Sequence, residues 1–112
     1  MTYHRLAEAV SKAGFFTSGN WKHSMICASK IGADGTFTGN SFWVAHREAG
    51  WFLGVLGGRV YRMPDPERVP ELCIEWLRRR PDRLAYDIDS HIRREFDLIE
   101  VEPDDSTVYP SA

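Results

Sequence analysis

Residues 41–63 read SFWVAHREAGWFLGVLGGRVYRM, and this stretch decides the fold. Aromatic and β-branched residues are frequent in it, and two turn signals, Glu48-Ala49-Gly50 and Gly57-Gly58, interrupt it. Short β-rich runs separated by glycine-containing turns are typical of consecutive antiparallel strands. The stretch therefore predicts three strands of a β-meander.

An earlier segment supplies a fourth strand. Residues 23–31 have β character, and Asp34-Gly35 lies between them and the quoted stretch. Because Asp-Gly favours a type I′ turn, in which both central residues have positive φ, we place this pair at the centre of a hairpin. Met25 is then predicted to face Val44 on the neighbouring strand.

The two later turns set the remaining registers. If the first turn has three residues, Leu53 faces Ala45. If the second has only its two glycines, Gly54 faces Tyr61, and an aromatic ring opposite a strand glycine covers the bare backbone. These registers decide which side chains share a face of the sheet.

Helical patterns flank the meander. Thr2 can cap a helix over residues 3–13, and a second helix is predicted between Asp65 and Pro81. A third, weaker helical pattern covers residues 89–96. The chain therefore predicts an α+β fold with one N-terminal helix, a four-stranded antiparallel β-meander and two C-terminal helices, in that order.

Size and composition indicate a single domain over residues 1–112. Apolar residues make up 43% and charged residues 27% of the chain, which is ordinary for a globular protein and argues against wholesale disorder. Residues 98–102 could add a short strand, whereas residues 103–112 are acidic, contain Pro and Ser, and are expected to be poorly ordered.

Charge and hydropathy narrow the partners. A net charge of −2 gives no global field that would recruit nucleic acid or an anionic membrane. The apolar stretches are far shorter than the ~20 residues of a membrane-spanning helix. Cys27 and Cys73 lie in apolar surroundings, and no signal peptide is recognised, so we expect buried free thiols and a cytoplasmic protein.

Strand alternation assigns the meander's side chains to two faces. The first face is predicted to carry Met25, Cys27, Phe42, Val44, Phe52, Leu56, Tyr61 and Met63. The second is predicted to carry Ile26, Ala28, Trp43, Ala45, Leu53, Val55 and Val60. Both faces are apolar, and three short helices have little material to cover both, so we expect a second copy or another protein to cover part of one face. The alternative is that the helices flank both faces.

The apolar side chains predicted on both faces of the sheet lead to two functional hypotheses. The first is a non-catalytic interaction or structural module that forms a homodimer or binds a protein through its sheet. Its candidate contact residues are apolar side chains of the sheet, in which aromatics dominate interface energetics: Trp43, Phe52, Tyr61, Phe42, Leu53 and Val55. The second is a small-molecule-binding protein or enzyme with a pocket between the sheet and the Arg-bearing C-terminal helices.

Two weaker patterns remain. His23, His46 and Cys27 would lie on one face in the predicted register and are candidate metal ligands, although structural histidines explain them better because zinc usually takes three or four protein ligands. Arginines near the C-terminal helices could form a basic patch, but the helix dipole alone explains those at the helix end, and nucleic-acid binding is not favoured. They are Arg78, Arg79, Arg80, Arg83, Arg93 and Arg94.

Catalytic signatures are not found. Ser24, Ser29 and Ser41 lack a glycine-framed turn, and Cys27 is expected to be buried and inert. The glycine pairs of the chain serve turns and do not open a helix, so they do not predict a phosphate cradle. We therefore expect no cofactor and lean against enzymatic activity.

Overall fold

The computed structural model describes residues 1–21 and 23–102, and within them the chain folds as an α+β domain with one six-stranded antiparallel sheet. Neighbouring strands in the chain are also neighbours in the sheet. In chain order they are β1 (Phe16–Trp21), β2 (Ser24–Ala28), β3 (Ser41–Arg47), β4 (Gly50–Val55), β5 (Val60–Met63) and β6 (Ile99–Val101).

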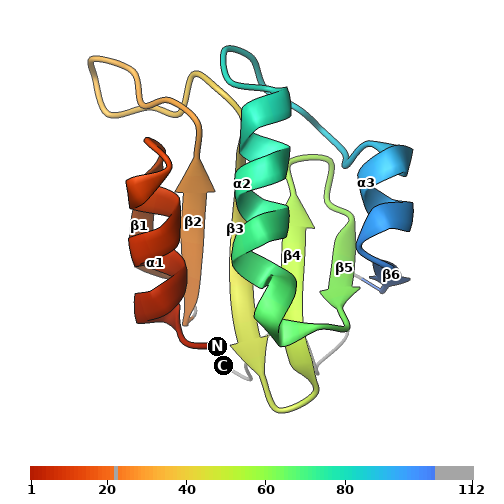
Figure 1. The fold of residues 1–112 in the computed structure, drawn as a ribbon. Helices are drawn as coiled ribbons and strands as arrows, with labels where there is room; N and C mark the ends of the chain where they lie inside the picture. The colour runs from red at the N-terminus through yellow and green to blue at the C-terminus, as the bar shows by residue number, and fades with distance from the viewer. Residues whose placement is uncertain (22, 103–112) are drawn as a thin grey trace.

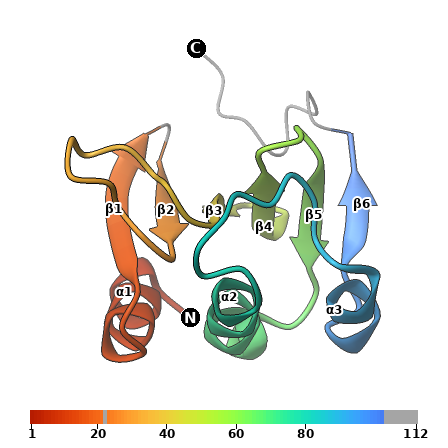
Figure 2. The ribbon, with the colours of Figure 1, turned by 90° about the horizontal axis from the view of Figure 1, so that it is seen from above.

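All three helices of the described residues lie on the same side of the sheet, as Figures 1 and 2 show. α1 (Tyr3–Lys12) lies against β1 and β2, α2 (Val69–Arg79) against β3 and β4, and α3 (Ser90–Glu95) beside β5 and β6. The alternative of helices on both faces is therefore wrong for this part of the chain. One sheet face is covered by helices and the other is not.

The main core lies between the helices and the covered face. Leu6 of α1, Trp76 and Leu77 of α2, and Ile92 of α3 are at most 1% exposed. They belong to one apolar cluster with the inward-facing strand side chains Met25, Cys27, Phe42, Val44, Trp51, Leu53, Val55, Tyr61 and Met63. Both cysteines are buried and free, as expected.

The helix starts follow the sequence signals. The side chain of Thr2 accepts a hydrogen bond from Arg5 N at 3.1 Å and caps α1. Asp65 likewise accepts from Glu67 N, but it caps a 3₁₀ turn, η1 (Pro66–Arg68), and α2 begins only at Val69. Pro70 has no N–H to donate back to Pro66, so a helix can hold it only in its first turn.

Two strands lie outside the predicted meander. β6 falls within residues 98–102, where the sequence indicates a short strand, whereas no strand is predicted over the mostly polar residues of β1. β1 is an edge strand that pairs only with β2, so it forms without the apolar alternation that marks central strands. Residues 103–112, expected to be poorly ordered, lie outside the described residues.

The first hairpin has the predicted register but another turn. Met25 pairs with Val44, as expected. However, Gly35 N donates to Gly32 O at 2.9 Å, so the central residues of the turn are Ala33 and Asp34. The Asp34 carboxylate accepts hydrogen bonds from the Thr36 hydroxyl and backbone N–H, which lower the pKa of Asp34 and hold the turn.

The predicted position of β4 is wrong by one residue on both sides. Leu53 pairs with Val44 on β3 and with Tyr61 on β5. The connection before Gly50 has two residues instead of three, and the connection before Arg59 has three residues instead of two, since Val55 N donates to Arg59 O. Side chains alternate along a strand, so this slip exchanges the two faces of β4. The two errors cancel at β5, whose side chains lie on the predicted face.

The same slip changes the neighbour of Gly54. Gly54 pairs with Trp43 on β3 and Val60 on β5, not with Tyr61. A Cβ atom at Gly54 would overlap the indole of Trp43, so the ring lies directly over the bare glycine backbone. An aromatic ring does cover this glycine, but it comes from the other neighbouring strand.

Candidate functional site

The sheet face without helices is the strongest candidate for a functional surface, and we call it the helix-free face. Two rows of paired residues run across it from β2 to β6. The first is Ile26, Trp43, Gly54, Val60 and Val101, and the second is Ser24, Ala45, Phe52, Arg62 and Ile99. Phe16 of β1 and Leu56 after β4 extend the face, and the loop residue Phe37 borders it.

Exposed apolar side chains concentrate on this face. Phe16 is 45%, Phe37 38%, Leu56 47% and Ile99 45% exposed. The described residues contain only two other large apolar side chains that are exposed, and both belong to the connection between α2 and α3. Scattered exposed apolar residues are normal, but several on one sheet face indicate a contact surface.

A cavity of about 180 Å³ opens on the helix-free face. Ile26, Trp43 and Leu56 line it on the sheet, with the Trp43 ring lying over Gly54, and Phe37 lines it from the loop between β2 and β3. The cavity is smaller than the roughly 300 Å³ at which ligand pockets usually begin. Its size and apolar lining suit one side chain of a partner better than a whole small molecule.

The structure separates the six predicted contact residues. Trp43 and Phe52 lie on the helix-free face, where Phe52 and Val60 form a small apolar cluster with Trp43 and Val101 packed against it. Tyr61, Phe42, Leu53 and Val55 belong to the main core under the helices. The one-residue slip of β4 explains why Leu53 and Val55 lie in the main core and why Phe52 lies on the helix-free face. It also hid Leu56, which sequence reasoning had assigned to the opposite face.

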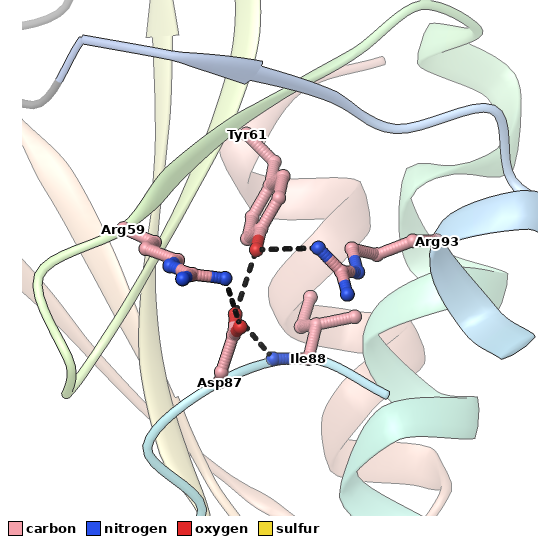
Figure 3. Close-up of polar contacts among 5 residues, drawn as sticks. All are labelled: Arg59, Tyr61, Asp87, Ile88 and Arg93. Carbon is pink, nitrogen blue, oxygen red and sulfur yellow. Dashed lines mark hydrogen bonds and ion pairs between the residues drawn. The ribbon is translucent and has the colours of Figure 1, made fainter. Parts of the chain in front are cut away.

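A second candidate is a polar cluster around Asp87, drawn in Figure 3. The Asp87 carboxylate accepts hydrogen bonds from the Tyr61 hydroxyl at 2.7 Å, from Arg59 Nη1 at 2.8 Å and from the backbone N–H of Ile88 at 2.8 Å. Arg93 Nη1 donates to the Tyr61 hydroxyl oxygen at 3.4 Å. Sequence reasoning missed this cluster because its members come from β5, α3 and two connections.

The Asp87 cluster is a structural clasp. Burial and the hydrogen bond to Asp87 raise the pKa of Tyr61, which favours the neutral phenol over a phenolate nucleophile or base. The carboxylate is engaged by three donors, and Gly57 N also donates to Tyr86 O at 2.8 Å. Together these bonds attach the connection between α2 and α3 to the turn between β4 and β5.

Two arginines of the predicted basic patch have partners within the fold. Arg79 forms ion pairs with Glu75 at 3.5 Å and Asp89 at 3.8 Å. Arg93 points toward Tyr61, and its guanidinium lies 5.8 Å from the centre of that ring. Arg78 and Arg94 are exposed.

The predicted metal ligands do not converge. His23 lies in the turn before β2 with a φ of 56°, and the pairing of β2 with β3 ends at Ser24 and Ala45, so His23 does not face His46. His46 stacks on Trp51 with ring centres 4.7 Å apart, and Cys27 is fully buried. Within the described residues, no group of three or more His, Cys, Asp or Glu side chains could hold a metal ion.

Comparison with known protein families, with curated proteins and with solved structures finds no match for this chain. No helix in residues 1–21 and 23–102 has both the length and the apolar character needed to cross a bilayer. Function is therefore inferred from the geometry of the helix-free face.

Proposed function

We propose that this protein is a non-catalytic interaction module that uses the helix-free face as its contact surface, and that its partner is a second copy of the chain. The observation that carries the proposal is the exposure of Phe16, Phe37, Leu56 and Ile99 on or beside one sheet face, where Phe37 and Leu56 also line an apolar cavity. Burial of such surface is the dominant favourable term in most protein association.

Symmetry supports a second copy as the partner. Twofold dimers are the commonest oligomers, and a sheet face readily packs on its own copy because sheets stack about 10 Å apart with interdigitating side chains. The exposed Leu56 and Phe37 beside an apolar cavity provide both projecting and receiving features for such packing. Two free buried thiols, Cys27 and Cys73, support a reducing compartment such as the cytoplasm as the proposed location.

The alternative hypothesis of a small-molecule pocket between sheet and helices has less support. The cavity at that place, between the end of β5 and the helices α2 and α3, has a volume of about 10 Å³. Met63, Leu72 and Phe96 are among its lining residues. That space is about enough for one water molecule.

Light scattering at a series of concentrations tests the proposal. We expect the mass to rise with concentration from that of one chain, 12.8 kDa, toward twice that value. Leu56→Ser should weaken self-association at least tenfold, because it places a hydroxyl in the apolar contact. The matched control is Leu84→Ser, since Leu84 is similarly exposed, at 40%, but belongs to the connection between α2 and α3.

Two results would overturn the proposal. One is a chain that remains monomeric up to about 1 mM, where association would be worth no more than about 4 kcal/mol. The other is a dimer that Leu56→Ser and Leu84→Ser weaken equally. Circular dichroism of both variants confirms that any difference comes from the surface and not from unfolding.

A further inference from the structure

The charges of the helix-free face are all of one sign. Among the described strand residues whose side chains lie on it, Arg47 and Arg62 are charged and none is acidic. Arg62 is half-buried beside Phe52 in the second row, and it forms no ion pair with any described residue. A ligand that complements this face therefore carries negative charge together with an apolar side chain for the cavity.

The chain contains one segment with this composition directly after the last strand. Residues 103–112 read PDDSTVYPSA, with Asp104 and Asp105 followed by Val108 and Tyr109. They contain no basic residue. Along the segment, counted from the end of β6, the acidic residues come first and the apolar residues second. Across the sheet, also counted from β6, Arg62 comes first and the cavity second.

The end of β6 places this segment at the right edge. Val101 pairs with Val60, and Val60 pairs with Gly54, so the chain leaves β6 in the same row that leads to the cavity. Crossing from β6 to β3 takes three strand spacings, or about 14 Å. The seven Cα–Cα steps from Glu102 to Tyr109 span up to about 23 Å, which is enough.

We propose that residues 103–112 bind the helix-free face of their own chain, with Tyr109 in the cavity beside Trp43 and with Asp104 and Asp105 near Arg62. The inference concerns the regulation of the surface used in the proposed function. A tethered segment acts at an effective concentration of the order of millimolar, so it competes with an outside partner for the same apolar surface. Displacing it lowers the apparent affinity of that partner.

A spin label on the segment tests this contact in the full chain. Ser106→Cys introduces a labelling site, and labelling is selective because Cys27 and Cys73 are buried. In NMR spectra, a nitroxide at this position should reduce the intensities of the backbone amide signals of Trp43, Gly54 and Leu56 at least twofold. The amide signals of α1, on the other side of the sheet, should lose much less intensity. Equal loss at all these positions, or no loss, would overturn the proposal.

Two further arms separate the possible occupants. Tyr109→Ala in the labelled chain should reduce the signal loss at Trp43 at least twofold, whereas the matched change Ser111→Ala should not. In a mixture of spin-labelled chain and isotope-labelled chain without the spin label, signal loss at Trp43 would mean that the segment binds a second copy, and would overturn binding within one chain.

The outcome of the spin-label experiment is independent of the outcome of the self-association test. Signal loss within a monomeric chain would support the segment as ligand while the homodimer proposal fails. A dimer that Leu56→Ser weakens, with no signal loss from the spin label, would support the homodimer and overturn the segment. Binding of the segment also requires that Asp104→Asn with Asp105→Asn reduce the signal loss.

Discussion

The two faces of the sheet carry similar apolar residues but differ in how far these residues are exposed to solvent. Leu53 lies under the helices and is 0% exposed, whereas Leu56, three positions later, is 47% exposed. Both are leucines in or next to the same strand, in a stretch that is apolar throughout. Hydrophobicity alone therefore does not determine which residues form the core. The main core lies on the face that the helices cover.

The two faces also differ in how they treat polar groups. At the margins of the helix-covered face, polar groups bond to one another: Tyr3 donates to His23 O at 2.7 Å, and Tyr61 donates to Asp87. The helix-free face holds Arg62 near apolar residues without a described ion-pair partner. The covered side also holds two buried nitrogens without a hydrogen-bond partner among the described residues, Trp76 Nε1 and Arg93 Nε, so the difference between the faces lies in the charge of Arg62.

The largest expected effect compares the two leucines. Leu53→Ala should lower the free energy of unfolding by about 2–5 kcal/mol, because it leaves a cavity in the core. Leu56→Ala should change it by no more than about 0.5 kcal/mol, as is usual at exposed positions. Urea unfolding followed by circular dichroism measures both. Similar losses for the two variants would mean that the helix-free face is part of the folding core.

A smaller effect is expected where the helix-free face is most closely packed. Gly54→Ala should lower the free energy of unfolding by about 1–3 kcal/mol, because the new methyl group would overlap the Trp43 ring. The indole must move, so the fluorescence spectrum should also change. Gly19→Ala is the matched strand control, since a Cβ there meets no atom within 4 Å. Equal destabilisation by both variants would contradict the packing of Trp43 on Gly54.

The smallest effect concerns the clasp at the edge of the covered face. Tyr61→Phe removes the hydrogen bond to Asp87 and should cost about 1 kcal/mol at neutral pH. The raised pKa of Tyr61 means that the folded state holds the phenol proton more tightly than the unfolded chain. This contribution to stability is complete below the unfolded pKa, about 10, and is lost as the pH rises above it.

Unfolding at pH 8 and at pH 10.5 checks this sign. The wild-type chain should lose more stability between these values than Tyr61→Phe does. Tyr86→Phe is the control, because Tyr86 is 65% exposed and should not alter the slope. The buried Cys73 thiol, whose pKa is also raised, contributes a loss of the same sign to all three proteins. A steeper loss in Tyr61→Phe than in the wild type would contradict the clasp.

Local signals were sufficient for much of the fold. Thr2 and Asp89 cap helices because their side chains accept hydrogen bonds from backbone N–H groups two or three residues later. The register of Met25 with Val44 was also predicted correctly. Each of these features depends on residues close in sequence or on a strong β pattern.

Turn length was the point at which local reasoning failed. Glu48-Ala49-Gly50 is compatible with a two-residue or a three-residue connection, and Gly50, with a φ of 129°, lies inside β4 rather than in the turn. The choice exchanges the two faces of a strand that is apolar on both, so hydrophobic alternation could not correct it. The contact between Gly54 and Trp43 and the exposure of Leu56 follow only from the register that formed.

The sequence by itself determined an antiparallel sheet in the quoted stretch, the positions of its helices and an apolar character on both sheet faces. These depend on backbone propensity, capping and side-chain period, which act over a few residues. Two features appear only in the tertiary structure. All three described helices cover the same face, and Asp87 accepts hydrogen bonds from Tyr61 and Arg59. Those outcomes depend on packing between distant segments, where the burial of one face excludes the same helices from the other.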